Sequence, residues 1–548
     1  MDGPPLMDLT AVELARFLDT QGNANKAVSL LTDLLSRDPR SASARSLTAL
    51  ARLAYTNKNW REAGVLWRML ADSPACDCEA LVKCAHCLIE QGQYAEAGSL
   101  SARLAARLEV ERDRWRSGES DELLAGLYEQ ICLHVLGNDP ARAERALQLA
   151  APFPGYAAKI LGRTGGVNLA GDLSDGAIRQ RLDCALRDWE MRGSTVPYLQ
   201  TRRASLKAEN APRSVEGKRI LLVMRQYFLD RTDSREHELA VFFQTSARAA
   251  GLEILFFPSE RLTNPKGSPP DRQYSELDRL ARLILSAKPD WVIFDELCNQ
   301  NPGGEYAGAE VFRNVLCALK ARQPFQLAGF YPDSWMPQCL ATIAYVRPFA
   351  DVVWHLNDYP PQTTDREAEA KMFWAPIPYP DALFQPGPNG KDIETAFVGS
   401  LYRYNFPRGL WLALIKSRDI PCQLVLSRHT TGDSKAGASA QDYAAFMSRL
   451  RISVNFSART ASRKIMTGRA WESILSQSLL LEEDNEEITR FFAPFVHYVP
   501  FRTIDELSAY VSFFQRNEAE RRSIAERAFA WFQRCYSKDR IWSDLISL

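Results

Sequence analysis

The 548-residue chain contains no apolar run that approaches the roughly 18 residues needed to cross a membrane. Its first residues, MDGPPLMDLT, carry neither a basic segment nor an apolar core, so we expect no signal peptide. Lys+Arg and Asp+Glu both total 67, which gives zero formal net charge and no indication of a nucleic-acid or membrane-surface binder. These absences together predict a cytoplasmic protein.

The 11 cysteines are scattered and odd in number, unlike the even, regularly spaced set of a disulfide framework. The one tight group is Cys76, Cys78, Cys84 and Cys87, in a stretch that is predicted to be helical. This group is better explained as ordinary buried cysteines than as a zinc site, because cysteine is a common small buried residue. We therefore expect a reducing compartment and no bound metal.

A chain of this length is too long for one hydrophobic core, so two to four domains are expected. Its hydrophobic content of 46% and charged content of 24% are those of an ordinary globular protein. Changes in pattern along the chain predict four parts. They are helical repeats over 1–150, a helical linker over 151–215, an α/β lobe over 216–380, and a second α/β lobe with terminal helices over 381–548.

The first 150 residues are helical and repetitive. TNKNWREAGVLWRML and EQGQYAEAGSLSARL align so that Trp60 and Tyr94 lie 34 positions apart, as do Ala63 and Ala97. The period, the aromatic–alanine core and the closing prolines resemble tetratricopeptide repeats, whose arrays present a groove to a peptide or partner protein. GNDPARAERALQLA, at 137–150, would be a last irregular copy. A helical bundle that only supports the next domain is the alternative.

Strands and helices alternate from residue 219 onward, which predicts βα units and a parallel sheet covered by helices on both faces. Strands are expected at 219–224, 252–258, 291–297, 326–333 and 350–356. Helices are expected at 175–192, 237–251, 275–290 and 309–322. The Pro-rich segment 371–386 predicts a crossover, after which residue 392 begins a second set of βα units.

The most informative stretch runs from 450 to 492. Apolar and polar residues alternate over 450–457, which predicts a strand with one buried face. A basic loop follows, Thr467 or Gly468 starts a short helix, and SLLLE at 478–482 reads as a buried strand. This βαβ unit would bind a ligand at the carboxyl end of its strands.

Arg469 and Glu472 lie three residues apart and so share a face of that short helix. The free N–H groups at a helix start favour an anion, and a guanidinium fork matches phosphate oxygens. The Glu472 carboxylate could accept hydrogen bonds from a diol such as ribose. The pair therefore predicts a nucleotide or nucleotide-sugar site, and on spacing alone a surface Arg–Glu pair is the alternative.

The run TGRAWESILSQSLLLEEDNEEITRFFAPFVHYVPFRTIDELSAYV resembles the carboxyl-terminal domain of GT-B glycosyltransferases, nearest to the CgeB-like, "glycosyl transferases group 1" type. The matching positions are Gly468, Arg469, Glu472, 479–482, 495–499 and 505–507. Gln477 stands where the family pattern has glycine, which bears on helix–strand packing. Lys464 stands where many relatives have glutamate, which bears on the usual contact to the donor sugar.

The resemblance covers about residues 215–548 and implies a two-lobed α/β GT-B fold of two Rossmann-like domains, preceded here by the all-α repeats. It implies a UDP- or GDP-sugar type of donor in the cleft between the lobes and no divalent metal, since cations and a helix start offset leaving-group charge. AFVGSLYRYNFPR resembles the first strand and loop of the second lobe. Arg403 is preferred over Arg408 there, because Arg408 follows a proline at a helix start. The donor-site set is then Gly399, Ser400, Arg403, Lys464, Gly468, Arg469 and Glu472, with Arg463 as an alternative to Lys464.

Two first-lobe residues are candidates for catalysis. Asp333, in FYPDSW, follows a strand and could act as general base on an acceptor hydroxyl, although a turn or helix cap is the alternative. His355, in HLND, lies at a strand edge and is the second candidate. His497 is expected to be buried in a strand. Further acceptor-side candidates are Arg225, Tyr227, Asp295, Glu296, Asn357 and Asp358.

The favoured interpretation is a cytoplasmic, metal-independent glycosyltransferase whose repeats recruit a protein acceptor. One alternative is a repeat scaffold with a degenerate transferase half, which Gln477 and Lys464 would support. Another is an enzyme that builds surface polysaccharide with the same chemistry. The sugar, the base and the stereochemical outcome stay open at this point.

Overall fold

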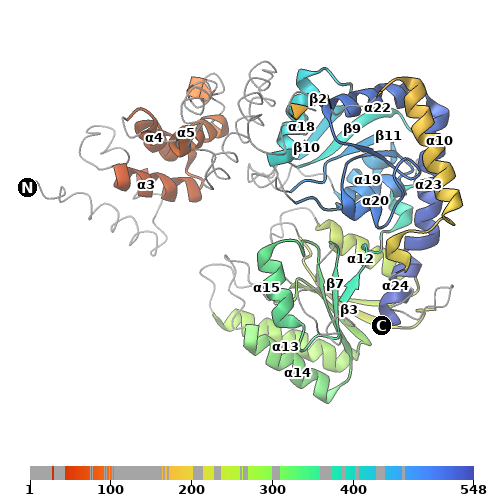
Figure 1. Cartoon of the computed structure of the whole chain (residues 1–548). Helices are drawn as coiled ribbons and strands as arrows, with labels where there is room; N and C mark the ends of the chain where they lie inside the picture. The colour runs from red at the N-terminus through yellow and green to blue at the C-terminus, as the bar shows by residue number, and fades with distance from the viewer. Residues whose placement is uncertain are drawn as a thin grey trace, which may run out of the picture.

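The computed structural model has two α/β lobes that lie side by side, each built on a sheet of parallel strands (Figure 1). The two Rossmann-like lobes expected from the resemblance are therefore confirmed. The described residues are 28–29, 32, 44–73, 76, 78–91, 93, 96–97, 99–100, 103, 163–164, 167–168, 172–200, 214–227, 236–259, 262, 270–298, 309–357, 372–385, 390–400, 406–427, 439–459 and 463–548.

The first lobe is built on a parallel sheet whose six described strands lie in the order β4-β3-β5-β6-β7-β8. The strands are β3 (Arg219–Met224), β4 (Glu253–Pro258), β5 (Trp291–Asp295), β6 (Gln326–Tyr331), β7 (Val352–His355) and β8 (Met372–Trp374). The helices α13 (Pro270–Ala287), α14 (Ala309–Arg322) and α15 (Pro337–Val346) share a core with one face, and α12 (Glu238–Ala249) packs on the other. Strand order reverses between β3 and β5, where such sheets bind ligands at the carboxyl edge.

The second lobe has five described strands in the order β10-β9-β11-β12-β13, all paired in parallel. They are β9 (Ile393–Ser400), β10 (Gln423–Ser427), β11 (Leu450–Asn455), β12 (Leu479–Glu483) and β13 (Val499–Phe501). The helices are α18 (Phe406–Ser417), α19 (Ala440–Ser448), α20 (Gly468–Leu475), α21 (Glu486–Thr489), α22 (Ile504–Arg516) and α23 (Glu518–Tyr536). The order reverses between β9 and β11.

The sequence-based view of β11 as a strand with one buried face is wrong. β11 lies between β9 and β12, and helices cover both faces of the sheet, so Ser453 and Asn455 are as buried as the apolar residues beside them. Each polar side chain has a partner: the Ser473 hydroxyl donates to the Ser453 hydroxyl at 2.7 Å, and Asn455 bonds to three side chains. The alternation of apolar and polar residues along β11 therefore directs the apolar side chains into a core on one face and the polar side chains into a buried hydrogen-bond network on the other.

The Pro-rich crossover predicted at 371–386 contains a strand and a helix. Met372–Trp374 forms β8 and pairs with β7, because these residues precede the prolines and keep their N–H donors. The prolines follow, and the segment ends in the short helix α17 (Asp381–Phe384). The Trp374 indole donates to the Leu356 carbonyl at 3.1 Å, which fixes the segment against the first sheet.

One helix before the first lobe packs on the second lobe, and the last helix returns from the second lobe to the first. α10 (Asp175–Met191), close to the predicted 175–192, lies along α23 in Figure 1, and its Arg181 donates to the Tyr510 hydroxyl at 2.9 Å. The last helix, α24 (Lys538–Ile546), crosses back to the first lobe, where the Trp542 indole donates to the Ser246 hydroxyl at 3.2 Å.

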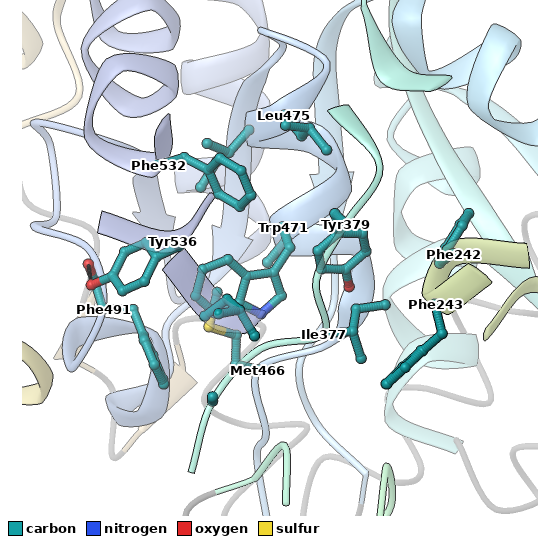
Figure 2. Packing of buried hydrophobic residues seen from close by; sticks show 14 of the residues in the cluster. Phe242, Phe243, Ile377, Tyr379, Met466, Trp471, Leu475, Phe491, Phe532 and Tyr536 are labelled. Carbon is teal, nitrogen blue, oxygen red and sulfur yellow. Dashed lines mark hydrogen bonds between the residues drawn. The ribbon is translucent and has the colours of Figure 1, made fainter. Parts of the chain in front are cut away.

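A cluster of aromatic side chains continues from one lobe to the other (Figure 2). Phe242 of α12 contacts Tyr379 of the crossover at a ring distance of 5.8 Å, and the Tyr379 hydroxyl donates to the Gly468 carbonyl at 3.2 Å. Trp471 of α20 then meets Tyr536 of α23 at 5.2 Å. The start of α20 is thus packed directly against the junction between the lobes.

Gln477 follows α20 and has φ of +54°, a left-handed conformation that costs a non-glycine residue energy. This explains why glycine is expected at that position, and it shows that the glutamine adopts the same turn. The helix still packs onto its sheet, with Ala470 and Ile474 fully buried.

The described amino-terminal helices are α3 (Ala44–Thr56), α4 (Trp60–Ala71) and α5 (Cys78–Glu90). Trp60 contacts Tyr55 of α3 and His86 of α5, each at a ring distance of 5.3 Å, so it fills the space between neighbouring helices. The helical prediction is confirmed for these segments, and the repeat type stays a prediction. Tyr94 and the copy at 137–150 lie outside the described residues.

None of the described helices is long and apolar enough to cross a membrane. Within the described ranges, no three His, Cys, Asp or Glu side chains are grouped in a way that could hold a metal ion.

Candidate functional site

Several predicted site residues lie at the strand reversal of the second sheet, between β9 and β11. Phe397 and Gly399 come from the end of β9, Asn455 ends β11, and Gly468 and Arg469 open α20. The carboxyl ends of parallel strands at such a reversal form the usual ligand edge of an α/β sheet. The structure therefore brings Gly399, Gly468 and Arg469 together, as the sequence predicts.

Gly399 allows Arg469 to lie directly over the backbone of β9. A Cβ atom at Gly399 would be 2.7 Å from the Arg469 Nη2 and 3.0 Å from the Phe397 ring, closer than real Cβ contacts. The structure shows that this glycine makes room for the guanidinium.

The half-buried Arg469 is held by three different side chains. Its Nη1 donates to the Asn455 Oδ1 at 3.0 Å, its guanidinium lies 5.3 Å from the centre of the Phe397 ring, and it hydrogen-bonds to Tyr443. Its Nε is buried and has no hydrogen-bond partner among the described residues. The guanidinium is thus oriented in advance and keeps donor capacity for an anion.

The start of α20 adds backbone donors beside Arg469. Thr467 precedes the helix, but its hydroxyl accepts from the Asn455 Nδ2 at 2.8 Å and makes no capping bond to the helix. The prediction that a short helix starts at Thr467 or Gly468 is therefore confirmed, although the Thr467 hydroxyl bonds to Asn455 and not to the helix. Helix N–H groups that no side chain caps favour an anion in front of them.

Glu472 lies one turn beyond Arg469 and is buried. Its Oε2 accepts a hydrogen bond from the Tyr443 hydroxyl at 2.5 Å. Burial raises the pKa of Glu472 to about 7, against the lowering effects of Tyr443 and Arg469, and the charge of Glu238 from the first lobe adds to the rise. Neither Arg469 nor Glu472 is exposed, so the alternative of a surface pair does not hold. The carboxyl group is suited to hydrogen bonding with a hydroxylated ligand.

Lys464 is engaged on its own loop. Its Nζ lies 3.1 Å from the Glu483 carboxylate and donates to the Asp484 carbonyl at 2.6 Å. The same carboxylate accepts from the backbone N–H groups of Ser457 and Ala458, each at 3.1 Å. Lys464 therefore helps to hold the loop, and its role toward a diphosphate stays a prediction.

The predicted loop after β9 is only partly described. Arg403 lies outside the described residues, and for Ser400 only its place at the end of β9 is described. Arg408, which the sequence argument ranked below Arg403, is buried at the start of α18 with its guanidinium 5.6 Å from the centre of the Phe397 ring. Two arginines from two helix starts thus share one aromatic ring, which sequence spacing did not indicate.

Asp333 and His355 both lie at the carboxyl edge of the first sheet. Asp333 is half-buried and its Oδ1 accepts from the Trp335 indole at 3.1 Å. His355 is 4% exposed, its Nδ1 lies 2.8 Å from the Asn357 carbonyl, and burial lowers its pKa to about 4. A buried imidazole of such low basicity is poorly suited to removing a proton, so Asp333 is the better placed of the two.

A second carboxylate lies at the strand reversal of the first sheet. Glu296 follows β5, pairs with Arg225 at 2.8 Å, and has φ of +51°, a strained conformation of the kind that clusters at functional sites. Burial and the charges of Glu296 and Asp333 raise the pKa of the Cys339 thiol to about 12, so the two carboxylates lie around one thiol.

The other first-lobe candidates are spread along the same edge. Asp295 ends β5 and is buried, Tyr227 forms a backbone bridge with Glu236, and Asp358 lies outside the described residues. In the second lobe, His497 is buried and stacks on Trp531 at 5.3 Å, as predicted, but it lies in a turn before β13 and not in a strand.

Residues 408–547 match the family model described as "Glycosyl transferase-like". No curated protein matches the chain in sequence.

Three solved structures have low similarity to this chain. HepE (Alr3699) of Anabaena, in complex with UDP and glucose, is 10% identical, covers 60% of this chain and 100% of its own, and has a TM-score of 0.39. Sucrose-phosphate synthase of Thermosynechococcus elongatus is 14% identical, covers 60% and 97%, and also scores 0.39. The O-GlcNAc transferase of Thermobaculum terrenum, as a mutant, is 13% identical, covers 98% and 95%, and scores 0.34.

Proposed function

We propose that this chain, whose carboxyl-terminal lobe carries a glycosyl transferase-like domain, transfers a sugar from a nucleotide-sugar donor to an acceptor. The enzyme class is that of the glycosyltransferases, EC 2.4. The observation that carries the proposal is the position of Arg469. Its guanidinium lies over Gly399 at the strand reversal and beside the start of α20, where a diphosphate would meet both.

The neighbouring groups complete a nucleotide site. Glu472 and the Tyr443 hydroxyl form a partly buried pair one turn from Arg469, which suits the hydroxyl groups of a ribose. Arg469, Arg408 and the uncapped N–H groups of α20 would offset the charge that develops on the diphosphate leaving group. In this mechanism the chain's own cations carry out that task.

The first lobe would bind the acceptor. Asp333 is our candidate for the general base, because it follows β6 at the carboxyl edge and is half-buried rather than sequestered. Glu296 is the second candidate, since it lies at the strand reversal with a carboxylate 13% exposed and tied to Arg225. A base in this position would remove the proton from an acceptor hydroxyl as it attacks the sugar.

We also propose that the amino-terminal helices recruit a protein acceptor. Helical arrays of this type use their concave surface for partner proteins, and Trp60 packs between neighbouring helices here as such arrays require. Deletion of residues 1–150 should abolish transfer to a protein acceptor and spare hydrolysis of the nucleotide-sugar. Loss of both activities would contradict separable roles, and full activity on free glycans would favour the polysaccharide alternative.

The first experiment is thermal melting with UDP, GDP, CDP, CMP, ADP and dTDP, one at a time. A ligand at about 100 times its dissociation constant adds roughly 2.7 kcal/mol to the lobe that binds it, which moves the transition by several degrees. We expect one nucleotide to produce a selective shift. Arg469→Ala should abolish that shift, because it removes a charge-assisted contact.

Arg449→Ala is the matched control. Arg449 lies at the opposite end of β11, in an exposed ion pair with Asp392 at 2.5 Å, so its loss removes a charge from the same lobe and leaves the residues at the strand reversal unchanged. The control should keep the nucleotide-dependent shift. If no nucleotide stabilises the wild type at millimolar concentration, the proposal fails and the scaffold alternative gains support.

A further inference from the structure

A series of buried, hydrogen-bonded side chains lies beneath Arg469. Glu482 and Asn455 are both 0% exposed. The Glu482 Oε2 accepts from the Asn455 Nδ2 at 2.7 Å, and the Asn455 Oδ1 accepts from the Arg469 Nη1 at 3.0 Å. These hydrogen bonds therefore link Glu482, at the end of β12, to the Arg469 guanidinium through the side-chain amide of Asn455.

The acceptors around Asn455 determine which way its amide points. Its Nδ2 donates to Glu482 and also to the Thr467 hydroxyl at 2.8 Å, so both hydrogens are used on one side. The oxygen is then left to face Arg469. A reversed amide would place its hydrogens against the guanidinium, which has only donors. By accepting from the Asn455 Nδ2, Glu482 thus helps to orient the Asn455 Oδ1 as the acceptor for Arg469.

The surroundings of Glu482 favour a neutral carboxylic acid. Its Oε1 is buried without a hydrogen-bond partner among the described residues, and an uncompensated buried charge is costly. Burial raises the pKa of Glu482 to about 8, and the charge of Glu483 adds to the rise, whereas Asn455, Arg469 and Lys464 lower it. Lys464 is already paired with Glu483.

Among the described residues, the hydroxyl of Tyr498 also interacts electrostatically with this carboxyl, since burial and the charges of Glu482 and Asp484 raise the pKa of Tyr498. It brings no positive charge. Arg469 is therefore the cation that an ionised Glu482 would act on through Asn455. A neutral Glu482 supplies an acceptor for Asn455 and leaves the positive charge of Arg469 available to a ligand.

We infer that Glu482 is a positioning residue of the donor site, which holds the Arg469 guanidinium through Asn455 and does so as a neutral acid. The inference rests on the proposed function, because it assigns Glu482 a role in binding the donor's diphosphate. Ionisation of Glu482 would partly neutralise Arg469 and weaken that binding.

The test uses the full chain with Glu482→Gln and Glu482→Leu, each alone and combined with Arg469→Ala. Dissociation constants are measured by calorimetry for the nucleoside diphosphate that the wild type binds most tightly among UDP, GDP, CDP, ADP and dTDP. Glu482→Leu should weaken binding about tenfold, the scale of one hydrogen bond to a charged group. In the Arg469→Ala background it should change nothing further, because its effect acts through that arginine.

The pH dependence supplies a readout that does not need the leucine variant to fold. Wild-type affinity should fall between pH 7 and pH 9 as Glu482 ionises, whereas Glu482→Gln, which keeps an acceptor and never ionises, should lack this part of the loss. Glu472 titrates in the same range in both proteins, so the ratio of their affinities isolates Glu482.

Ser453→Ala is the matched structural control. Ser453 is buried on the same strand as Asn455 and bonds to the hydroxyl of Ser473, which contacts the backbone carbonyl of Arg469 and makes no bond to its guanidinium. It should lower stability and leave nucleotide affinity unchanged. Equal losses from Glu482→Leu in both backgrounds, or identical pH profiles for wild type and Glu482→Gln, would overturn the positioning role alone. A wild type that binds none of the nucleotides overturns the proposed function and this inference together.

Discussion

Gly399→Ala tests the close approach between β9 and Arg469. The added Cβ would lie 2.7 Å from the Arg469 Nη2 and 3.0 Å from the ring of Phe397, so one neighbour must move. Phe397 is fully buried in the sheet, whereas Arg469 is half-buried at the end of a flexible side chain. We expect the guanidinium to move away from β9 and from its acceptor on Asn455.

The cost follows from the contact that is lost. A hydrogen bond to a charged group contributes about 1.5–3 kcal/mol, so nucleotide affinity should fall by about ten- to hundredfold, toward that of Arg469→Ala. Gly399 does not have a positive φ, so the alanine brings no backbone strain and the effect is steric. Calorimetric titration with the preferred nucleotide measures the change directly.

Gly176→Ala is the control, because a Cβ at that position in α10 would meet nothing within 4 Å. It should leave nucleotide affinity unchanged. Wild-type affinity in Gly399→Ala, together with a loss in Arg469→Ala, would show that the guanidinium acts from a place other than the one over β9. The explanation given for the glycine would then be wrong.

Three further outcomes follow from the structure. Gln477→Gly should raise the free energy of unfolding by about 1 kcal/mol in urea titrations, because it relieves a left-handed residue at φ of +54°. Burial raises the pKa of Glu472 to about 7 and that of Glu482 to about 8, so the contribution of these two groups to stability is present at acidic pH and is lost as pH rises through those values. The variant that carries both Glu472→Gln and Glu482→Gln should show a smaller decline of the melting temperature between pH 5 and pH 9. Asp333→Asn should lower the rate of transfer about a hundredfold or more and leave the nucleotide dissociation constant unchanged, since a general base acts on the acceptor.

The sequence predicts most of the two sheets because their strands are nearly continuous apolar runs between helices with clear polar faces. It also places Arg469 and Glu472 on one helix face at the correct sheet edge. These are local properties, determined by residue spacing along one or two elements. The positions of both residues in the structure follow from the βαβ unit around them.

The missed residues depend on contacts between distant parts of the chain. Asn455 had the sequence signature of a solvent-facing strand position, and only the placement of β11 at the centre of the sheet buries it. Phe397 is an ordinary core residue in sequence, yet two arginines from different helices meet at its ring. The pairing of Lys464 with Glu483 was also missed, because Glu483 lies on the next strand, where sequence spacing does not reveal the pair.

The return of α24 to the first lobe also affects the order in which the protein can fold during synthesis. The ring of Trp542 packs against Phe243 at 5.9 Å and against Trp354 at 6.1 Å, so the core of the first lobe includes a residue made about 170 positions after the last strand of its sheet, β8. Domains generally fold as units while the chain is being made, amino-terminal ones first. Here the first lobe cannot complete its core until the ribosome has released residue 542, and part of its apolar surface stays uncovered until then. A chaperone that binds exposed aromatic surface would find its target in this interval.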